Sequence, residues 1–90
     1  MVESDVVVVN ELGLHARAGA RLVKLANTFD CSISLSRGSE GKIADAKSIL
    51  DVMYLAAECG AQLQVKADGV DERQAVDAVS ALFANGFQET

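Results

Sequence analysis

The sequence contains no proline and no tryptophan, and one tyrosine and three phenylalanines are its only aromatic residues. Half of its 90 residues are nevertheless apolar, so aliphatic side chains must supply the core. A chain of this length forms one domain, here residues 1–90, near the lower size limit for folding without a metal or disulfides. No repeat, low-complexity stretch or proline-rich linker divides it.

Cysteine and histidine are equally scarce. Cys31 and Cys59 are not spaced as a CxxC pair, and His15 is the single histidine. No second histidine is present with which the cysteines could build a metal site. We therefore interpret both cysteines as small apolar core residues of a protein in a reducing compartment, and we expect no cofactor.

Positive charge is in the minority, with 8 Lys and Arg against 13 Asp and Glu and a net charge of -5. An acidic surface argues against nucleic acid as a partner. A protein with a basic surface stays possible as a partner. The valine run at residues 6–9 is too short for a signal peptide or a membrane span. We expect a cytoplasmic, monomeric protein without membrane insertion.

Helical and strand patterns alternate along the chain. Strands are predicted at residues 6–9 (a buried run), 31–36, 42–46 and 62–67, and helices at 16–27, 48–55 and 71–85. Asp71 is the expected N-cap of the last helix, and Asn85-Gly86 its stop. This order predicts an α+β two-layer domain, a mostly antiparallel sheet with helices on one face.

The histidine lies where the first helix is about to begin, in Gly-Leu-His-Ala-Arg at residues 13–17. Unpaired amides and the macrodipole at a helix start favour an anion and disfavour an imidazolium. A neutral ring there keeps a nucleophilic nitrogen, and Arg17 adds a guanidinium suited to phosphate oxygens. The spacing alone favours the simpler interpretation, in which His15 only caps the helix and Arg17 is solvated.

Longer segments of the sequence favour a functional role for His15 over simple capping. "GLHARAGARLVKLANTF", then "DAKSILDVMYLAAECGAQLQV" and "ADGVDERQAVDAV", resemble the HPr family of histidine-containing phosphocarriers of the bacterial sugar phosphotransferase system. The resemblance runs from about residue 6 to residue 85, with the blocks in order. It implies an HPr-like open-faced β-sandwich, a four-stranded antiparallel sheet covered on one face by three helices.

The resemblance also implies a function. His15 would accept a phosphoryl group on Nδ1 from enzyme I, which draws it from phosphoenolpyruvate, and pass it to enzyme IIA domains. Arg17 would stabilise the phosphate, and the chain would be a phosphoryl carrier rather than an enzyme with its own turnover. The family usually has proline after the arginine, whereas this chain has Ala18-Gly19. Alanine there loosens the first turn by about 0.4–1 kcal/mol and restores one amide.

Ser48 begins the short helix, and Ser48-x-x-Asp51 has the form of a capping box. Capping alone explains this serine, with a contribution of about 0.5–2 kcal/mol. In the resembled family the same serine is a target of HPr kinase/phosphorylase in many bacteria, so Ser48 is also a candidate regulatory site. Nearby Asp45 and Asp51 would oppose a phosphate there.

A partner surface is expected beside these two positions. The resemblance implies that the start of the first helix and apolar residues after Ser48 dock on enzyme I and enzyme IIA, although a core role or a solvated charge explains each residue equally well. The candidates are Ala16, Ala18, Arg21, Lys24, Lys47, Ile49 and Met53.

Three alternatives stay open. A nitrogen-related regulatory branch of the family would use the same chemistry. A regulatory binding module would act through phospho-Ser48, with His15 of little importance. The segment "GSEG" at residues 38–41 fits the Gly-x-x-Gly loop of KH domains, but it carries an acid and follows the wrong elements for RNA binding.

Overall fold

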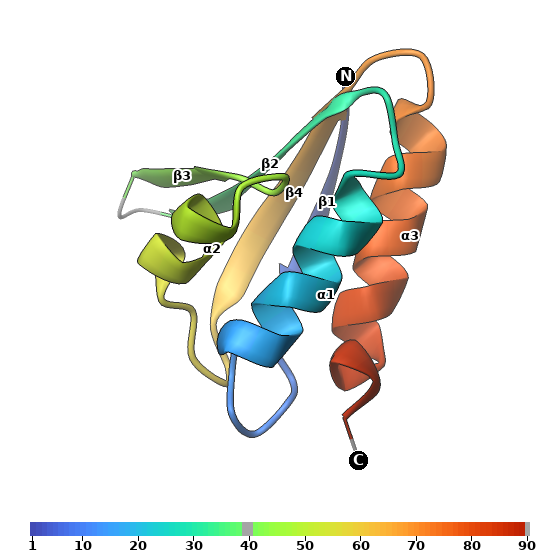
Figure 1. Ribbon diagram of the computed structural model, residues 1–90. Coiled ribbons are helices and arrows are strands. Elements are labelled where there is room, and N and C mark those ends of the chain that lie inside the picture. Colours follow the sequence, from blue (N-terminus) through green and yellow to red (C-terminus); the bar gives the residue numbers. More distant parts are fainter. Residues whose placement is uncertain (39–40, 90) are drawn as a thin grey trace.

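The computed structural model describes residues 1–38 and 41–89. Its sheet has the order β1-β4-β2-β3 and is antiparallel throughout, with β1 at Val2–Val7, β2 at Ser32–Arg37, β3 at Lys42–Asp45 and β4 at Gln62–Asp68. The helices are α1 (Ala16–Ala26), α2 (Ile49–Leu55) and α3 (Glu72–Ala84), followed by a short 3-10 helix η2 (Gly86–Gln88). The α-helices cover the same face of the sheet (Figure 1). The predicted open-faced α+β sandwich is confirmed.

The two central strands follow the predicted alternation. Ile33 and Leu35 of β2 and Leu63 and Val65 of β4 are buried against the helices, and Leu35 lies opposite Val65 in the register. The residues between them face away from the helices and are polar, so the other face of the sheet meets solvent. The predicted turn at residues 37–41 includes residues 39 and 40, which lie outside the described part of the chain.

The expectation of a wholly buried strand at residues 6–9 is wrong. Val6 and Val8 are buried, but Val7 and Val9 are 44% and 53% exposed. The reason is that helices cover only one face of the sheet, so alternate valines, in β1 and in the two residues after it, face the open side (Figure 1). Burial therefore alternates along the four valines, and a run of identical side chains carries no pattern from which this could be predicted.

The helices begin close to where the sequence predicts, but the capping of α3 differs from expectation. Asp71 stands at its N-cap position without a side-chain capping bond. Its carboxylate accepts hydrogen bonds from the Asp30 and Cys31 amides at 2.8 and 2.9 Å. The Asp30 amide is the main reason why the pKa of Asp71 lies below its usual range. Asp71 thus ties the loop before β2 to the start of α3.

The segment after α3 was not predicted. It turns back through Phe87 and Gln88, which have φ angles of +60° and +64°, and the Phe87 side chain is fully buried. The Phe87 ring packs edge-on against Phe83, with ring centroids 4.8 Å apart. Arg21 of α1 donates a hydrogen bond to the Phe87 carbonyl oxygen. Residues 86–89 are therefore fixed against α1 and the core.

No helix within the described ranges is both long and apolar enough to cross a membrane.

Truncating Phe87 tests this anchor. We expect Phe87→Ala to lower the free energy of unfolding by about 3–5 kcal/mol, because a fully buried ring leaves a cavity. Leu50→Ala is the control, since Leu50 is 79% exposed and its loss should change stability by less than about 0.5 kcal/mol. Urea unfolding followed by circular dichroism measures both, and similar values for the two variants would show that Phe87 is not an anchor.

Candidate functional site

His15 is the N-cap residue of α1, as predicted. Its backbone is extended, with φ -75° and ψ -177°, and its ring nitrogen Nδ1 accepts a hydrogen bond from the Arg17 amide at 3.2 Å. The His15 carbonyl oxygen accepts the first helical hydrogen bond, from Gly19 N at 2.7 Å. The imidazole therefore occupies the place where serine or aspartate usually supplies a capping oxygen. Its Nδ1 lone pair faces the unpaired amides of the first turn.

The loop before His15 holds the ring at the surface. Leu14 is buried, and its amide donates to the Ala57 carbonyl oxygen at 2.8 Å. The buried Asn10 donates through Nδ2 to the Gly13 carbonyl oxygen at 2.6 Å. Gly13 itself has a φ of +70°, in the left-handed region. With its neighbours tied down in this way, the His15 side chain keeps 28% of its surface exposed.

The second ring nitrogen has a partner that the sequence analysis missed. Glu89 lies 74 positions along the chain, and its Oε2 is 2.5 Å from His15 Nε2. The other carboxylate oxygen accepts a hydrogen bond from Asn10 Nδ2 at 3.0 Å. This bond first, and the contact with His15 next, hold the pKa of Glu89 below its usual range. No local pattern marks Glu89, because the contact depends on how residues 86–89 fold back.

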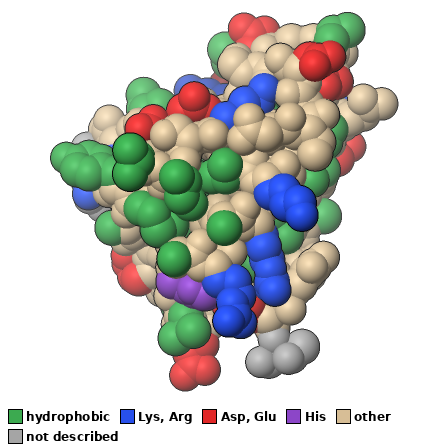
Figure 2. All heavy atoms as spheres, in the orientation of Figure 1, with side chains coloured by type: hydrophobic (Ala, Val, Ile, Leu, Met, Phe, Trp, Pro, Cys, Tyr) green, Lys and Arg blue, Asp and Glu red, His purple; other side chains and the backbone are tan. Residues whose placement is uncertain are grey.

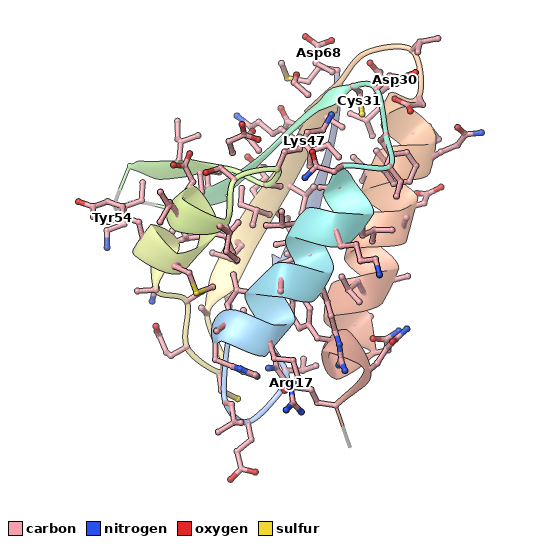
Figure 3. All side chains as sticks on the ribbon, viewed as in Figure 1. Arg17, Asp30, Cys31, Lys47, Tyr54 and Asp68 are labelled. Carbon is pink, nitrogen blue, oxygen red and sulfur yellow. The ribbon has the colours of Figure 1, made fainter. Side chains whose placement is uncertain are left out.

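An open cleft of about 1030 Å³ lies beside the ring. His15, Arg17, Arg21 and Glu89 all contribute to its walls. Figure 3 shows the Arg17 side chain at the end of α1 where the helix begins. A helix start with unpaired amides and two guanidinium groups is suited to receive an anion such as phosphate.

Ser48 is the N-cap of α2, and its Oγ accepts a hydrogen bond from the Asp51 amide at 3.3 Å. The second half of the expected capping box is absent from the described contacts, because Asp51 Oδ2 instead accepts from the Asp45 amide at 3.0 Å. Asn27, at the far end of α1, donates to the Lys47 carbonyl oxygen at 3.2 Å. Ser48 thus lies beside the end of α1, whereas His15 lies at its start.

The predicted partner residues fall into three groups. Ala16, Lys24 and Ile49 are exposed, whereas Arg21, Lys47 and Met53 are half-buried. The Lys47 ammonium donates to the Phe29 carbonyl oxygen at 2.7 Å, and Lys47 lies toward the opposite end of α1 from Arg17 (Figure 3). Ala18 is fully buried, so the expectation that it contacts a partner is wrong. Ala18 faces the core because the apolar stripe of α1 begins at this residue.

Exposed hydrophobic side chains are found on α2 and in the loop before His15. Ile49, Leu50 and Tyr54 of α2 are exposed, and so is Leu12 in the loop before His15. Met53 packs over Gly19, where a Cβ would collide with its Cε, so α2 lies directly on the first half of α1. Figure 2 shows hydrophobic side chains gathered over α2 and the start of α1, with the histidine and basic side chains at their edge. Such a patch is typical of a protein-binding surface.

Comparisons with known proteins agree with this geometry. The model of the PTS HPr component phosphorylation site matches residues 2–85. Phosphocarrier protein HPr of Cupriavidus necator is 47% identical over 89 residues, covering 99% of this chain and 98% of the relative. Phosphocarrier protein NPr of Escherichia coli K12 is 40% identical, covering 98% and 97%. The crystal structure of HPr-C-His from Thermoanaerobacter tengcongensis has a TM-score of 0.93 at 33% identity, covering 100% and 99%.

An open-faced sandwich that presents a histidine at a helix start is the architecture of a phosphocarrier. The chain belongs to the HPr family, the phosphocarrier proteins of the bacterial phosphotransferase system.

Replacing Gly13 tests the backbone that delivers His15. A Cβ at Gly13 would lie 2.8 Å from the Ala57 carbonyl oxygen. Gly41 is a matched control, because its φ is +71° and nothing among the described residues lies within 4 Å of a Cβ there. We expect Gly41→Ala to lower the free energy of unfolding by about 1 kcal/mol, the cost of left-handed backbone. For Gly13→Ala we expect about 2–3 kcal/mol, since the collision adds to that cost. Urea unfolding measures both, and equal losses would contradict the role of the close approach.

Proposed function

We propose that His15 accepts a phosphoryl group on Nδ1 from phosphorylated enzyme I and passes it to enzyme IIA domains. The observation that carries this proposal is the position of Nδ1, which faces the Arg17 amide at the start of α1 beside an open cleft. A ring nitrogen that accepts a hydrogen bond carries a lone pair and no proton, and this is the form that attacks phosphorus. The chain is a covalent intermediate between two enzymes rather than a catalyst with its own turnover.

The first turn of α1 then stabilises the phosphate. Once Nδ1 is bonded to phosphorus, the Arg17 amide can donate to a phosphoryl oxygen instead of the ring. The Arg17 guanidinium lines the same cleft and supplies a positive charge. Ala18, where the family usually has proline, leaves the amide of that position free to donate as well.

The hydrophobic area over α2 and the start of α1 is the proposed docking surface for both partners. Ile49 and Ala16 are exposed there, and Lys24 and Arg21 lie further along α1. Burial of apolar side chains supplies affinity, while the basic residues match acidic rims on the partners. Because donor and acceptor use the same face, we propose that they bind in turn to a monomeric carrier in the cytoplasm.

Removing the ring tests the acceptor. We expect His15→Ala to abolish labelling by phosphoenolpyruvate and enzyme I, because no other side chain supplies the attacking nitrogen. Intact mass measures the uptake, and the phosphate on the unchanged chain should be lost in acid and stable in base, as for phosphohistidine. Ser48→Ala is the control and should label fully. Undiminished labelling of the His15 variant would contradict the proposal.

Ser48 is the proposed regulatory site. Its hydroxyl is half-buried at the surface, and it caps a helix within the hydrophobic area, so a phosphate there would alter the docking surface. The Asp51 amide donates to Ser48 Oγ, so the Asp51 carboxylate lies close by. Its negative charge would repel a phosphate on Ser48. This second role rests on the family resemblance together with the position of the residue.

A kinase assay tests Ser48. Incubation with HPr kinase/phosphorylase and ATP should add one phosphate to the chain and none to Ser48→Ala, as measured by intact mass. The modification should be stable in acid, which distinguishes it from phosphohistidine. Unmodified protein after incubation would remove the regulatory proposal and leave capping as the whole role of Ser48.

The nitrogen-related branch is the second candidate, because NPr of Escherichia coli is 40% identical to the chain over 88 residues, which is 98% of its length. The two branches differ in the acceptor, not in the chemistry at His15. Transfer from the phosphorylated chain to a sugar-specific or a nitrogen-related enzyme IIA domain, compared side by side, distinguishes them.

A further inference from the structure

We propose that Glu89 is a positioning residue for phosphoryl transfer, holding the His15 ring through Nε2 so that Nδ1 stays free to react. The inference rests on the proposed function of His15 and adds a residue from the far end of the chain to it. The contact joins Glu89 Oε2 and His15 Nε2 over 2.5 Å.

The two ring nitrogens have different partners, and these define the state of the ring. Nδ1 faces the Arg17 amide, which is a donor, so Nδ1 must carry the lone pair. A neutral ring then carries its proton on Nε2, where the Glu89 carboxylate accepts it. The amide and the carboxylate therefore select the same tautomer from opposite edges of the ring. In Ser-His-Asp triads a carboxylate orients the histidine in the same way.

Glu89 is itself held in place. Asn10 donates from one amide nitrogen to both Gly13 O and Glu89 Oε1, so the loop that carries His15 also fixes the carboxylate. The buried Phe87 ring anchors the chain two residues earlier. The Glu89 side chain is 18% exposed and its carboxyl has a lowered pKa, chiefly because of the Asn10 bond, so it is ionised and partly shielded from solvent.

The chemistry gives this carboxylate a task. The Nδ1 lone pair forms a bond to phosphorus while the bond from phosphorus to the donor histidine of enzyme I breaks, and the electron pair leaves with the donor. The proton on Nε2 does not move, so the His15 ring gains a positive charge during transfer. Glu89 compensates that charge, and Arg17 in the same cleft remains available to the phosphoryl oxygens. Transfer to an acceptor reverses each change.

Two variants separate charge from shape. Glu89→Gln keeps an oxygen acceptor for Nε2 but removes the charge, and Glu89→Ala removes both. Glu3→Gln is the matched control, because Glu3 is exposed on edge strand β1 and the same charge is lost there. Labelling by phosphoenolpyruvate and limiting enzyme I is followed at several carrier concentrations. We expect the kcat of enzyme I, with the carrier as its substrate, to fall about fivefold for Glu89→Gln and about tenfold or more for Glu89→Ala. The KM for the carrier should stay unchanged. Glu3→Gln should match the unchanged chain.

Proton NMR gives a readout that does not depend on transfer. The Nε2 proton of the unchanged chain should appear as a downfield resonance protected from exchange, and it should be lost in Glu89→Ala while the rest of the spectrum shows a folded protein. Absence of that resonance from the unchanged chain, an unchanged kcat in both Glu89 variants, or a faster transfer in either would overturn the inference. A raised KM with normal kcat would overturn it as well, since it would make Glu89 a docking residue. Failure of the unchanged chain to label would instead remove the proposed function on which the inference rests.

Discussion

A hydrogen bond between a ring nitrogen and a helix amide sets the geometry on which the proposed chemistry of this molecule depends. Most helices begin with an oxygen-bearing side chain, whereas α1 begins with an imidazole whose Nδ1 accepts from the Arg17 amide. The bond caps the helix and uses the Nδ1 lone pair as its acceptor. One interaction thus serves both folding and the proposed reactivity, and the ring cannot be moved without altering the start of the helix.

The remainder of the fold supports that position from two sides. Leu14 is buried and fixes the loop that enters α1, and Phe87 is buried and fixes the segment that returns to it. The sheet takes no direct part in the site, but it supplies the floor on which α1 and α3 lie side by side (Figure 1). Exposed apolar side chains of α2 lie on the same face of the molecule as the His15 ring, and this shared face is the basis of the proposed docking surface (Figure 2).

Local patterns predicted most of this fold, because periodicity reports which face of an element is buried. The alternation through Ile33 and Leu35, and the helical stripe of α1, gave strands and helices in the right places. Sequence patterns that are uniform or short gave wrong predictions. The valine run concealed an edge strand, and Asp71 bonds to the loop before β2 rather than to its own helix.

The candidate site divides in the same way. The position of His15 at a helix start was visible in the local pattern, but the proposed roles of His15 and Arg17 came from the family resemblance, because their spacing alone favoured simple capping and a solvated arginine. Glu89 was not predicted, since a pair 74 positions apart leaves no local trace and the turn that brings it back needs left-handed backbone at Phe87. Burial of Ala18 was visible in the helical stripe of α1, and its assignment to the partner surface came from the family resemblance instead.

The buried ring of Phe87 has a consequence for how the site moves. Chain segments after a last helix usually fray on fast timescales, independently of the domain. Here, fraying of this segment stops at Phe87, whose aromatic side chain lies inside the core, and Glu89 is only two residues beyond that point. The contact between Glu89 and His15 is therefore linked to the core through Phe87, and this link is lost only when the core around that ring opens.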